Sequence, residues 1–423
     1  MVSSRLRNHS GSARTRLATV LLAVPIALTA LVVAPGVTQA RPEQAPAGAS
    51  SSARSHPSCS IPAAGQWGCM SDWISMQPVP AKRISAAAAA SPAAAGTKVP
   101  KPQDGLTPSD LRAAYRLPSK GGKGITVAIV DAYDHPKAES DLKVYRSVLK
   151  LPACTTDNKC FRKVNQVGKK KYPQPDAGWA GEIALDIQAV SAVCPQCKIL
   201  LVEANDPSFE NLSKAVNTAV RLGADIVSNS YGGDESAEEV RLYSKYYRHP
   251  KVPILASSGD DGLATASAPA VFPTVWSVGG TALTHSKAKG WLEKAWRHGG
   301  SACSDYVAKP SFQKDKLCAK RTVSDVSVVA DGFATYETYG LGEDNGWILS
   351  SGTSLSSPLL AAMMGLAGHP QKLASPGYAY AHADGYKDIV TGHNGLCEDA
   401  MCNAGVGYDA PTGVGAPSGL KGL

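Results

Sequence analysis

A chain of 423 residues, 43% of them hydrophobic, can form one large domain or two ordinary ones and is too apolar to be wholly disordered. Its 40 glycines and 29 prolines are scattered and its charges follow no heptads, which excludes a collagen and a coiled coil. The formal charge of +8 falls to +4 beyond the first 40 residues, which hold four arginines and no acidic residue. Without a basic stripe interleaved with aromatic residues, the sequence predicts no nucleic-acid partner.

The first 40 residues have the pattern of a secretory signal. Four arginines precede the apolar run 17–33, and small residues lead up to Ala40. The alternative is a membrane anchor, because a run of about 17 residues reaches the short limit for spanning a bilayer. We favour cleavage near Ala40, and therefore expect a secreted, extracellular protein with no membrane attachment after the signal is removed.

Ten cysteines fall along the chain as five pairs of sequence neighbours. Export makes disulfides plausible, and pairing between neighbours is the simplest connectivity, although sequence alone leaves it open. The Cys194–Cys197 pair could also belong to a redox motif or to half of a zinc site; with no second such motif, we favour a structural disulfide. The pairs are Cys59/Cys69, Cys154/Cys160, Cys194/Cys197, Cys303/Cys318 and Cys397/Cys402.

The stretch from Arg41 to about Lys101 is rich in Ala, Ser and Pro. Such a composition buries too little apolar surface to fold well, so residues 41–105 are interpreted as a low-complexity pro-segment or linker. The folded domain is expected to span residues 106–423.

Beyond Leu106, apolar β-branched runs alternate with helical patterns. This alternation predicts an α/β fold with a mostly parallel sheet covered on both faces, whose chemistry gathers where the strands end. The expected strands are 124–133, 198–204, 224–230 and 252–260, and the expected helices are 136–149, 179–193, 209–222 and 237–247.

A candidate nucleophile, Ser354, lies in the sequence SGTSLSSP, immediately before an apolar helical pattern. Backbone N–H groups at a helix start can stabilise a developing oxyanion. The alternative is an ordinary N-cap, for which serine and threonine are preferred. Four hydroxyl residues at one helix start exceed what a cap needs.

The candidate base is acidic rather than imidazole. Glu182 and Asp186 are four residues apart, and therefore share one helix face that continues with apolar residues. Like-charge repulsion and desolvation both oppose two ionised carboxylates there, and a shared proton resolves the conflict. An exposed acidic patch is the alternative. The histidines lie in loop-like surroundings, and His135 can equally belong to a turn.

A third acidic residue, Asp260, follows a buried strand in a Gly-flanked turn. A turn aspartate is common. It would gain a function if its protonated carboxyl donated a hydrogen bond to an oxyanion.

Together, these residues resemble the sedolisin family of serine-carboxyl peptidases. The resemblance implies a subtilisin-like three-layer sandwich in which Glu182 is the base, Asp186 orients it, Ser354 is the nucleophile and Asp260 stabilises the oxyanion. The segments LTPSDLRAAYRLP and FPTVWSVGGT are also similar to that family. The implied activity is endopeptidase action on proteins or peptides. Because carboxyls replace imidazole as the base, we expect an optimum at acidic pH, and we also expect a monomer.

The tail, with YKDIVTGHNG and GVGYDAPTGVG, is similar to the family's calcium site. The resemblance implies one Ca²⁺, because hard oxygen donors without sulfur or imidazole suit this ion. A glycine-rich closing loop is the alternative. The implied ligands are the carboxylates of Asp388 and Asp409 and the main-chain oxygens of Ile389, Gly405 and Gly407.

Two features depart from the family pattern. Only about 65 residues separate Ala40 from Leu106, whereas the family usually has a folded pro-domain of well over a hundred residues. Asp261 stands where the family usually has serine, and its charge could shift the pKa of Asp260.

Two other interpretations of the sequence stay open beside the serine-carboxyl peptidase. The first is a conventional subtilase that uses Asp131 with His135, which lie within one turn of the sequence. The second is a catalytically decayed, secreted binding protein on the same fold. Covalent labelling that depends on Ser354 would separate an enzyme from a binding protein.

Overall fold

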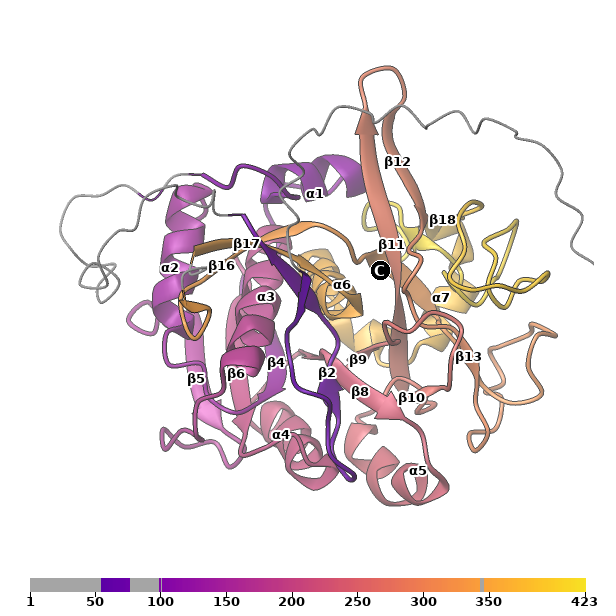
Figure 1. Cartoon of the computed structure of the whole chain (residues 1–423), viewed down its shortest axis with the longest axis horizontal. Coiled ribbons are helices and arrows are strands. Elements are labelled where there is room, and N and C mark those ends of the chain that lie inside the picture. Colours follow the sequence, from indigo (N-terminus) through magenta and orange to yellow (C-terminus); the bar gives the residue numbers. More distant parts are fainter. Residues whose placement is uncertain (1–54, 77–98, 100, 343–345) are drawn as a thin grey trace, which may run out of the picture. The chain divides into compact units, whose positions relative to one another are not determined.

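A computed structural model of the chain describes residues 55–76, 99, 101–342 and 346–423, and the side chains from Ser58 onwards (Figure 1). The predicted signal, residues 1–40, lies outside the described residues. Within them, no helix is both long enough and apolar enough to cross a membrane.

The central sheet has eight strands in the order β12-β11-β9-β7-β4-β6-β5, with β15 beside β11. Its pairs are parallel except for the antiparallel hairpin of β11 and β12. The predicted α/β fold with a mostly parallel sheet is thereby confirmed. The strands are β4 (Thr126–Ala132), β5 (Phe161–Asn165), β6 (Lys198–Ala204), β7 (Ile226–Asn229), β9 (Ile254–Ser257), β11 (Val275–Ser286), β12 (Gly290–Ala295) and β15 (Val326–Val329).

Alternate residues of the central strands enter two separate cores, one on each face. Val127 and Ile129 of β4 join the core beneath α3 and α6, whereas Ala128 and Val130 join the core beneath α4. Both faces are therefore apolar, as expected for a parallel sheet covered by helices. The helices are α1 (Pro108–Tyr115), α2 (Ala138–Val148), α3 (Ala177–Val193), α4 (Phe209–Arg221), α5 (Ala237–Tyr243), α6 (Thr353–Ala367) and α7 (Gly377–Ala381).

Two smaller sheets involve the segment that precedes the expected domain. One has the order β1-β3-β17-β16 and the other β10-β8-β2. Two further strand pairs lie outside these sheets. The pair β13–β14 joins the two ends of the loop 304–321, and the pair β18–β19 joins two parts of the C-terminal tail. The bounds are β1 (Ser55–Pro57), β2 (Gly68–Cys69), β3 (Asp72–Ser75), β8 (Tyr231–Asp234), β10 (Ser267–Ala268), β13 (Ala302–Cys303), β14 (Thr322–Val323), β16 (Phe333–Glu337), β17 (Gly346–Ser351), β18 (Tyr386–Lys387) and β19 (Ala416–Pro417).

The expected lack of structure between residues 41 and 101 is wrong for residues 55–76. These residues form β1, β2 and β3, and hydrogen-bond to the edges of β8 and β17. Composition did not predict these strands, because they are stabilised by the edges of strands distant in sequence rather than by a local apolar core. Whether residues 41–105 are a pro-segment stays a prediction.

The predicted helices and strands after Leu106 are present, with shifts at their ends. The last predicted helix ends at Tyr243 and continues as a 3₁₀ turn, Ser244–Tyr247. The strand predicted over residues 252–260 is confined to Ile254–Ser257, because the residues that follow turn away from the sheet.

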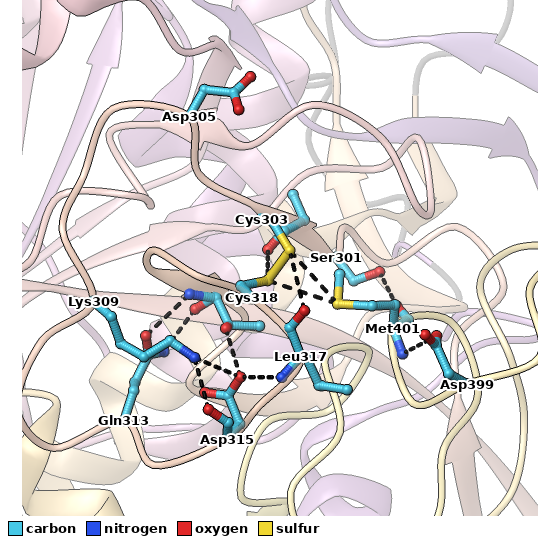
Figure 2. The surroundings of a disulfide bond; sticks show 12 residues. Ser301, Cys303, Asp305, Lys309, Gln313, Asp315, Leu317, Cys318, Asp399 and Met401 are labelled. Carbon is cyan, nitrogen blue, oxygen red and sulfur yellow. Dashed lines mark hydrogen bonds and ion pairs between the residues drawn. A yellow bond between two sulfur atoms is a disulfide. The ribbon is translucent and has the colours of Figure 1, made fainter.

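All five neighbouring cysteine pairs are disulfide-bonded, as the simplest connectivity predicts. Figure 2 shows the bond between Cys303 and Cys318, whose sulfurs lie 3.9 and 3.8 Å from the sulfur of Met401. The hydroxyl of Ser301 also donates to the main-chain oxygen of Met401, at 2.7 Å. These contacts connect the loop around β13 to the C-terminal tail.

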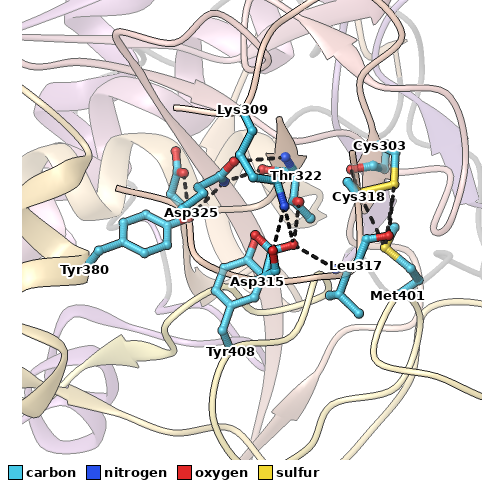
Figure 3. A network of polar contacts seen from close by, with 12 residues as sticks. Cys303, Lys309, Asp315, Leu317, Cys318, Thr322, Asp325, Tyr380, Met401 and Tyr408 are labelled. Carbon is cyan, nitrogen blue, oxygen red and sulfur yellow. Dashed lines mark hydrogen bonds and ion pairs between the residues drawn. A yellow bond between two sulfur atoms is a disulfide. The ribbon is translucent and has the colours of Figure 1, made fainter. Parts of the chain in front are cut away.

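A polar network fixes the C-terminal tail to the sheet (Figure 3). Asp325 accepts from the hydroxyl of Tyr380 at 2.9 Å and from the guanidinium of Arg321 at 2.7 Å. Asp315 accepts from Lys309 and Thr322, each at 2.9 Å. Because Arg321 and Asp325 are fully buried, the cost of desolvating each charge is offset only while the pair stays together.

Candidate active site

Ser354 is the second residue of helix α6 and is fully buried. Strand β17 ends three residues earlier, and Gly352 makes the turn with a φ of 141°, which disfavours any residue with a side chain. A Cβ on Gly352 would also lie only 2.1 Å from the carbonyl oxygen of Met70. The sequence thus places a serine hydroxyl at the start of a buried helix, as predicted.

Glu182 and Asp186 lie one turn apart on α3, and both are fully buried. The hydroxyl of Ser71 donates to Oε2 of Glu182 at 2.6 Å, and that of Ser230 donates to Oδ1 of Asp186 at 2.9 Å. Helix α3 carries no basic side chain to neutralise the pair. The predicted stacking of two acids on a buried helix face is confirmed.

Burial raises the pKa of Glu182 to about 8, against hydrogen bonds from Ser71 and Ser354 that lower it. Burial and the charges of Asp131 and Glu182 raise the pKa of Asp186 well above its usual range. The raised pKa of Asp186 favours its protonated form, which allows the two carboxyls to share one proton.

Asp131 is a third carboxyl of this cluster and was considered from the sequence only as a partner of His135. It lies near the end of β4, fully buried, and neither of its carboxyl oxygens accepts a hydrogen bond from the described residues. Burial, followed by the charge of Glu182, raises the pKa of Asp131 well above its usual range. An acid inside an apolar strand was the sequence signal for this buried position.

Asp260 follows β9 and lies against the start of α6. The N–H and hydroxyl of Thr353 donate to Oδ1 of Asp260, at 2.8 and 2.7 Å. Burial raises the pKa of Asp260 to about 7, opposed by these bonds and assisted by the charges of Asp72 and Asp261. A Cβ added to Gly352 would lie 2.7 Å from the other oxygen of Asp260, Oδ2, and 2.1 Å from the carbonyl oxygen of Met70. Oδ2 and this carbonyl oxygen therefore lie on the same side of Gly352.

His135 lies in a different cluster. Its Nε2 is 2.9 Å from Glu337 and 3.7 Å from Asp141, all three being buried. The ligand atoms of these three residues fall within 4.8 Å of one another. Among the described residues, the polar contacts of His135 include neither Ser354 nor Asp131, so the geometry does not favour a triad built on Asp131 and His135.

A cavity of about 590 Å³ lies beside Asp260. One wall is formed by Gly259 to Gly262, and the other by residues of the segment Ser58–Met76, which we call the strap. The carbonyl oxygen of Met70 in the strap accepts a hydrogen bond from the N–H of Ser354 at 3.1 Å. The strap therefore covers Ser354 as an extended segment, and the open part of the groove lies beside it, at Asp260.

The two acids of the predicted calcium site face one glycine-rich loop. The N–H of Gly405 donates to Asp409 at 2.9 Å, and that of Gly407 donates to Asp388 at 2.8 Å. Burial, assisted by the charge of Asp388, raises the pKa of Asp409 to about 6, against hydrogen bonds from Gly405 and Thr412 that lower it. The described contacts of the two carboxylates include no sulfur or imidazole, and carboxylates of this kind are the hard oxygen ligands that Ca²⁺ prefers.

A parallel sheet, a serine at a buried helix start and carboxyls facing it define a serine-type peptidase of subtilisin-like fold. Residues 122–376 match the subtilase family, and the chain belongs to that family. No curated protein matches the sequence significantly.

Among solved structures, the chain is similar to Pseudomonas sedolisin, a serine-carboxyl proteinase complexed with two molecules of pseudo-iodotyrostatin. The identity is 24%, the alignment covers 76% of this chain and 96% of that one, and the TM-score is 0.65. It is also similar to an S41 psychrophilic protease (14% identity, 73% and 96% covered, TM-score 0.49) and to sphericase (15%, 76% and 98%, TM-score 0.48). The likeness to sedolisin establishes the subtilisin-like fold.

Proposed function

We propose that the protein is a secreted serine-carboxyl endopeptidase, acting on proteins or peptides through Ser354, Glu182 and Asp186. The observation that carries this proposal is the fully buried carboxyl pair on α3, together with the Ser354 hydroxyl, which lies near enough to Glu182 to lower its pKa. A general base must come within hydrogen-bond reach of the proton it removes. In this structure the Ser354 hydroxyl donates to the main-chain oxygen of Ser230, at 3.3 Å, so it would turn towards Glu182 in the reaction.

In the proposed reaction, ionised Glu182 takes the proton of Ser354 as the serine oxygen attacks the substrate carbonyl. Asp186 keeps Glu182 oriented by donating its own proton to it. Glu182 then passes the transferred proton to the leaving amine, and an ester on Ser354 results. Water hydrolyses this ester in the second half of the reaction.

The oxyanion has two candidate donors. One is the N–H of Ser354, which already lies 3.1 Å from a peptide carbonyl oxygen, that of Met70. The other is Asp260, whose raised pKa favours the protonated form that can donate. Preorganised donors of this kind contribute about 10²–10³ to turnover in related chemistry.

One Ca²⁺ is proposed at Asp388 and Asp409, with main-chain oxygens of Ile389, Gly405 and Gly407. Its function there would be structural: the carboxylates of Asp388 and Asp409 would hold the ion and, once neutralised, would keep β18 and the glycine-rich loop of the tail together. No catalytic step depends on it.

The test is hydrolysis of an unstructured protein by wild type, Ser354→Ala and Glu182→Gln. Loss of turnover in both variants, with mid-chain cleavage by wild type, supports the serine-carboxyl endopeptidase. Turnover that survives Glu182→Gln would reject the assigned base. If no hydrolysis depends on Ser354, the hypothesis of a catalytically decayed binding protein is favoured. Its groove would then bind a peptide without cleaving it.

A further inference from the structure

His135, Asp141 and Glu337 form a buried cluster that the proposed reaction does not use. His135 lies in the turn between β4 and α2, Asp141 in the first turn of α2, and Glu337 at the end of β16. Figure 1 shows α2 beside β16. The exposed fractions of the three residues are 0%, 3% and 0%. The fold thus brings one imidazole and two carboxyls together where water has little access.

The spacing of these side chains suits one small cation. Nε2 of His135 lies 2.9 Å from Oε2 of Glu337 and 3.7 Å from Oδ2 of Asp141, and the ligand atoms of all three lie within 4.8 Å of one another. Nitrogen and oxygen ligands at about 2.0–2.1 Å from a tetrahedral Zn²⁺ are separated from each other by about 3.3 Å. The two measured distances lie on either side of this value, so small side-chain rotations would let all three atoms reach one ion.

The close contact between His135 and Glu337 is not a hydrogen bond. Although Nε2 and Oε2 are 2.9 Å apart, they are not aligned as donor and acceptor, and neither atom has a hydrogen-bond partner among the described residues. Polar atoms that are fully buried are rarely left in this state. A cation between the two atoms would bind both.

The cluster carries more negative charge than its surroundings neutralise. Among the described residues, the ion pairs of Asp141 and Glu337 are with His135 alone. The ammonium of the nearby Lys137 donates instead to the main-chain oxygen of Thr338, at 2.7 Å. Two buried carboxylates beside a neutral imidazole are costly, and a divalent cation would neutralise both.

Neighbouring groups hold the two carboxyls in position. The N–H and the hydroxyl of Thr338 donate to Asp141, at 3.0 and 2.8 Å. The N–H of Tyr339 donates to Oε1 of Glu337, which leaves Oε2 facing His135. Supporting hydrogen bonds of this kind orient the ligands of metal ions and tighten binding.

His135 can bind an ion through Nε2. The N–H of Lys137 donates to Nδ1 at 3.4 Å, so without an ion the ring proton lies on Nε2. An ion at Nε2 would shift this proton to Nδ1, at the expense of the contact with Lys137. Because that contact is longer than the usual 2.7–3.2 Å of a hydrogen bond, its loss costs little.

We propose that His135, Asp141 and Glu337 bind one Zn²⁺, or a transition-metal ion of similar preference, as a structural site. An imidazole ligand favours such an ion over Ca²⁺ and Mg²⁺, which prefer oxygen ligands alone. The second carboxyl oxygen of Asp141 is available as a fourth ligand. The ion would join α2 and β16 to the turn that follows β4. This inference depends neither on the proposed peptidase activity nor on the calcium proposed in the tail.

The experiment uses full-length Ser354→Ala, to prevent self-digestion, produced with and without added Zn²⁺ and exchanged into excess Ca²⁺. Elemental analysis should find one Zn²⁺ per chain in the supplied protein, with a melting temperature about 2 °C or more above that of the unsupplied protein. Asp141→Asn and Glu337→Gln in this background should lose about tenfold or more in Zn²⁺ affinity, measured against a coloured zinc chelator. The matched control is Glu139→Gln, an acid of α2 that binds Thr156 and should leave both results unchanged.

Every outcome decides for or against the site. If Ser354→Ala retains no Zn²⁺, or if Zn²⁺ leaves its melting temperature unchanged, the proposal is wrong, whether or not the ligand variants fold. Equal Zn²⁺ affinity in the parent and both ligand variants would place the ion elsewhere. Displacement of Zn²⁺ by excess Mg²⁺ would indicate a site for a hard cation instead. Because the ligands are buried, the ion should exchange slowly, so a chelator added to folded protein should take calcium from the tail first.

Discussion

Thr353 donates two hydrogen bonds to a single oxygen of Asp260, from its N–H at 2.8 Å and from its hydroxyl at 2.7 Å. Because Oδ1 accepts both bonds, the protonated form of Asp260 would carry its proton on Oδ2. Oδ2 lies over the face of Gly352 that also carries the Met70 carbonyl. In the proposed reaction, Thr353 would be a positioning residue that aims the proton of Asp260 at the oxyanion.

Replacing Thr353 by valine should lower turnover by about tenfold, because one of the two bonds that orient the oxyanion donor is lost. Since the Thr353 hydroxyl lowers the pKa of Asp260, its removal should also move the alkaline limb of the pH profile upward. The profile of peptide hydrolysis, compared with that of Thr218→Val on the far helix α4, measures both effects. If the rate falls but the alkaline limb of the pH profile does not move, Thr353 has only a structural role.

Glu182→Gln should cut turnover by about 10²-fold or more, the usual contribution of a positioned base. His135→Ala should have little effect on turnover per folded molecule, since His135 contacts Glu337 and Asp141 instead. Steady-state kinetics on protein checked for folding by circular dichroism compare the two. If His135→Ala lowers turnover more than Glu182→Gln does, the hypothesis of a conventional subtilase that uses Asp131 with His135 is favoured instead.

The pH profile of peptide hydrolysis should be bell-shaped, with its maximum below about pH 6. Asp260 must be protonated, and its pKa of about 7 with the strap in place means that activity falls as pH rises through that region. Glu182 must be ionised. With the strap bound, burial raises its pKa to about 8, so the covered site is a poor catalyst in acid. Because burial is the largest cause of both shifts, an optimum below pH 6 requires that water entering an open site lowers the pKa of Glu182.

Asp261→Ser tests the alkaline limb of that profile. The charge of Asp261 raises the pKa of Asp260, so its removal should pull the limb to lower pH without changing the acid limb. Rates measured across the pH range for wild type and the variant provide the comparison. A maximum above pH 8, or a limb insensitive to Asp261, contradicts the role given to Asp260.

Chelation of Ca²⁺ should lower the melting temperature and speed self-digestion, because an ion bound only by the native state stabilises it by mass action. Asp409→Ala should reproduce the loss and abolish the response to chelator. Calorimetry of Ser354→Ala protein avoids self-digestion during the scan, and Glu398→Ala supplies an exposed acid of the same tail as control. Identical melting curves with and without chelator would remove the ion from the tail.

Much of the site could be predicted because its elements are local in sequence. A spacing of four residues puts Glu182 and Asp186 on one helix face whatever surrounds the helix. Small and hydroxyl residues before an apolar pattern place Ser354 at a helix start. Neighbouring cysteines needed only short loops to pair, and alternating apolar runs implied the parallel sheet.

The tertiary structure alone decided what spans long sequence separations. Met70 and Ser354 are 284 residues apart, and nothing near Met70 in the sequence indicates a partner. Asp131 joined the carboxyl cluster, and His135 joined Glu337, only because the fold brings separate strands and helices together. Composition predicted no structure for the strap because its hydrogen bonds come from strand edges that the remainder of the chain supplies. Spacing thus determined which side chains share an element, and packing determined which elements meet.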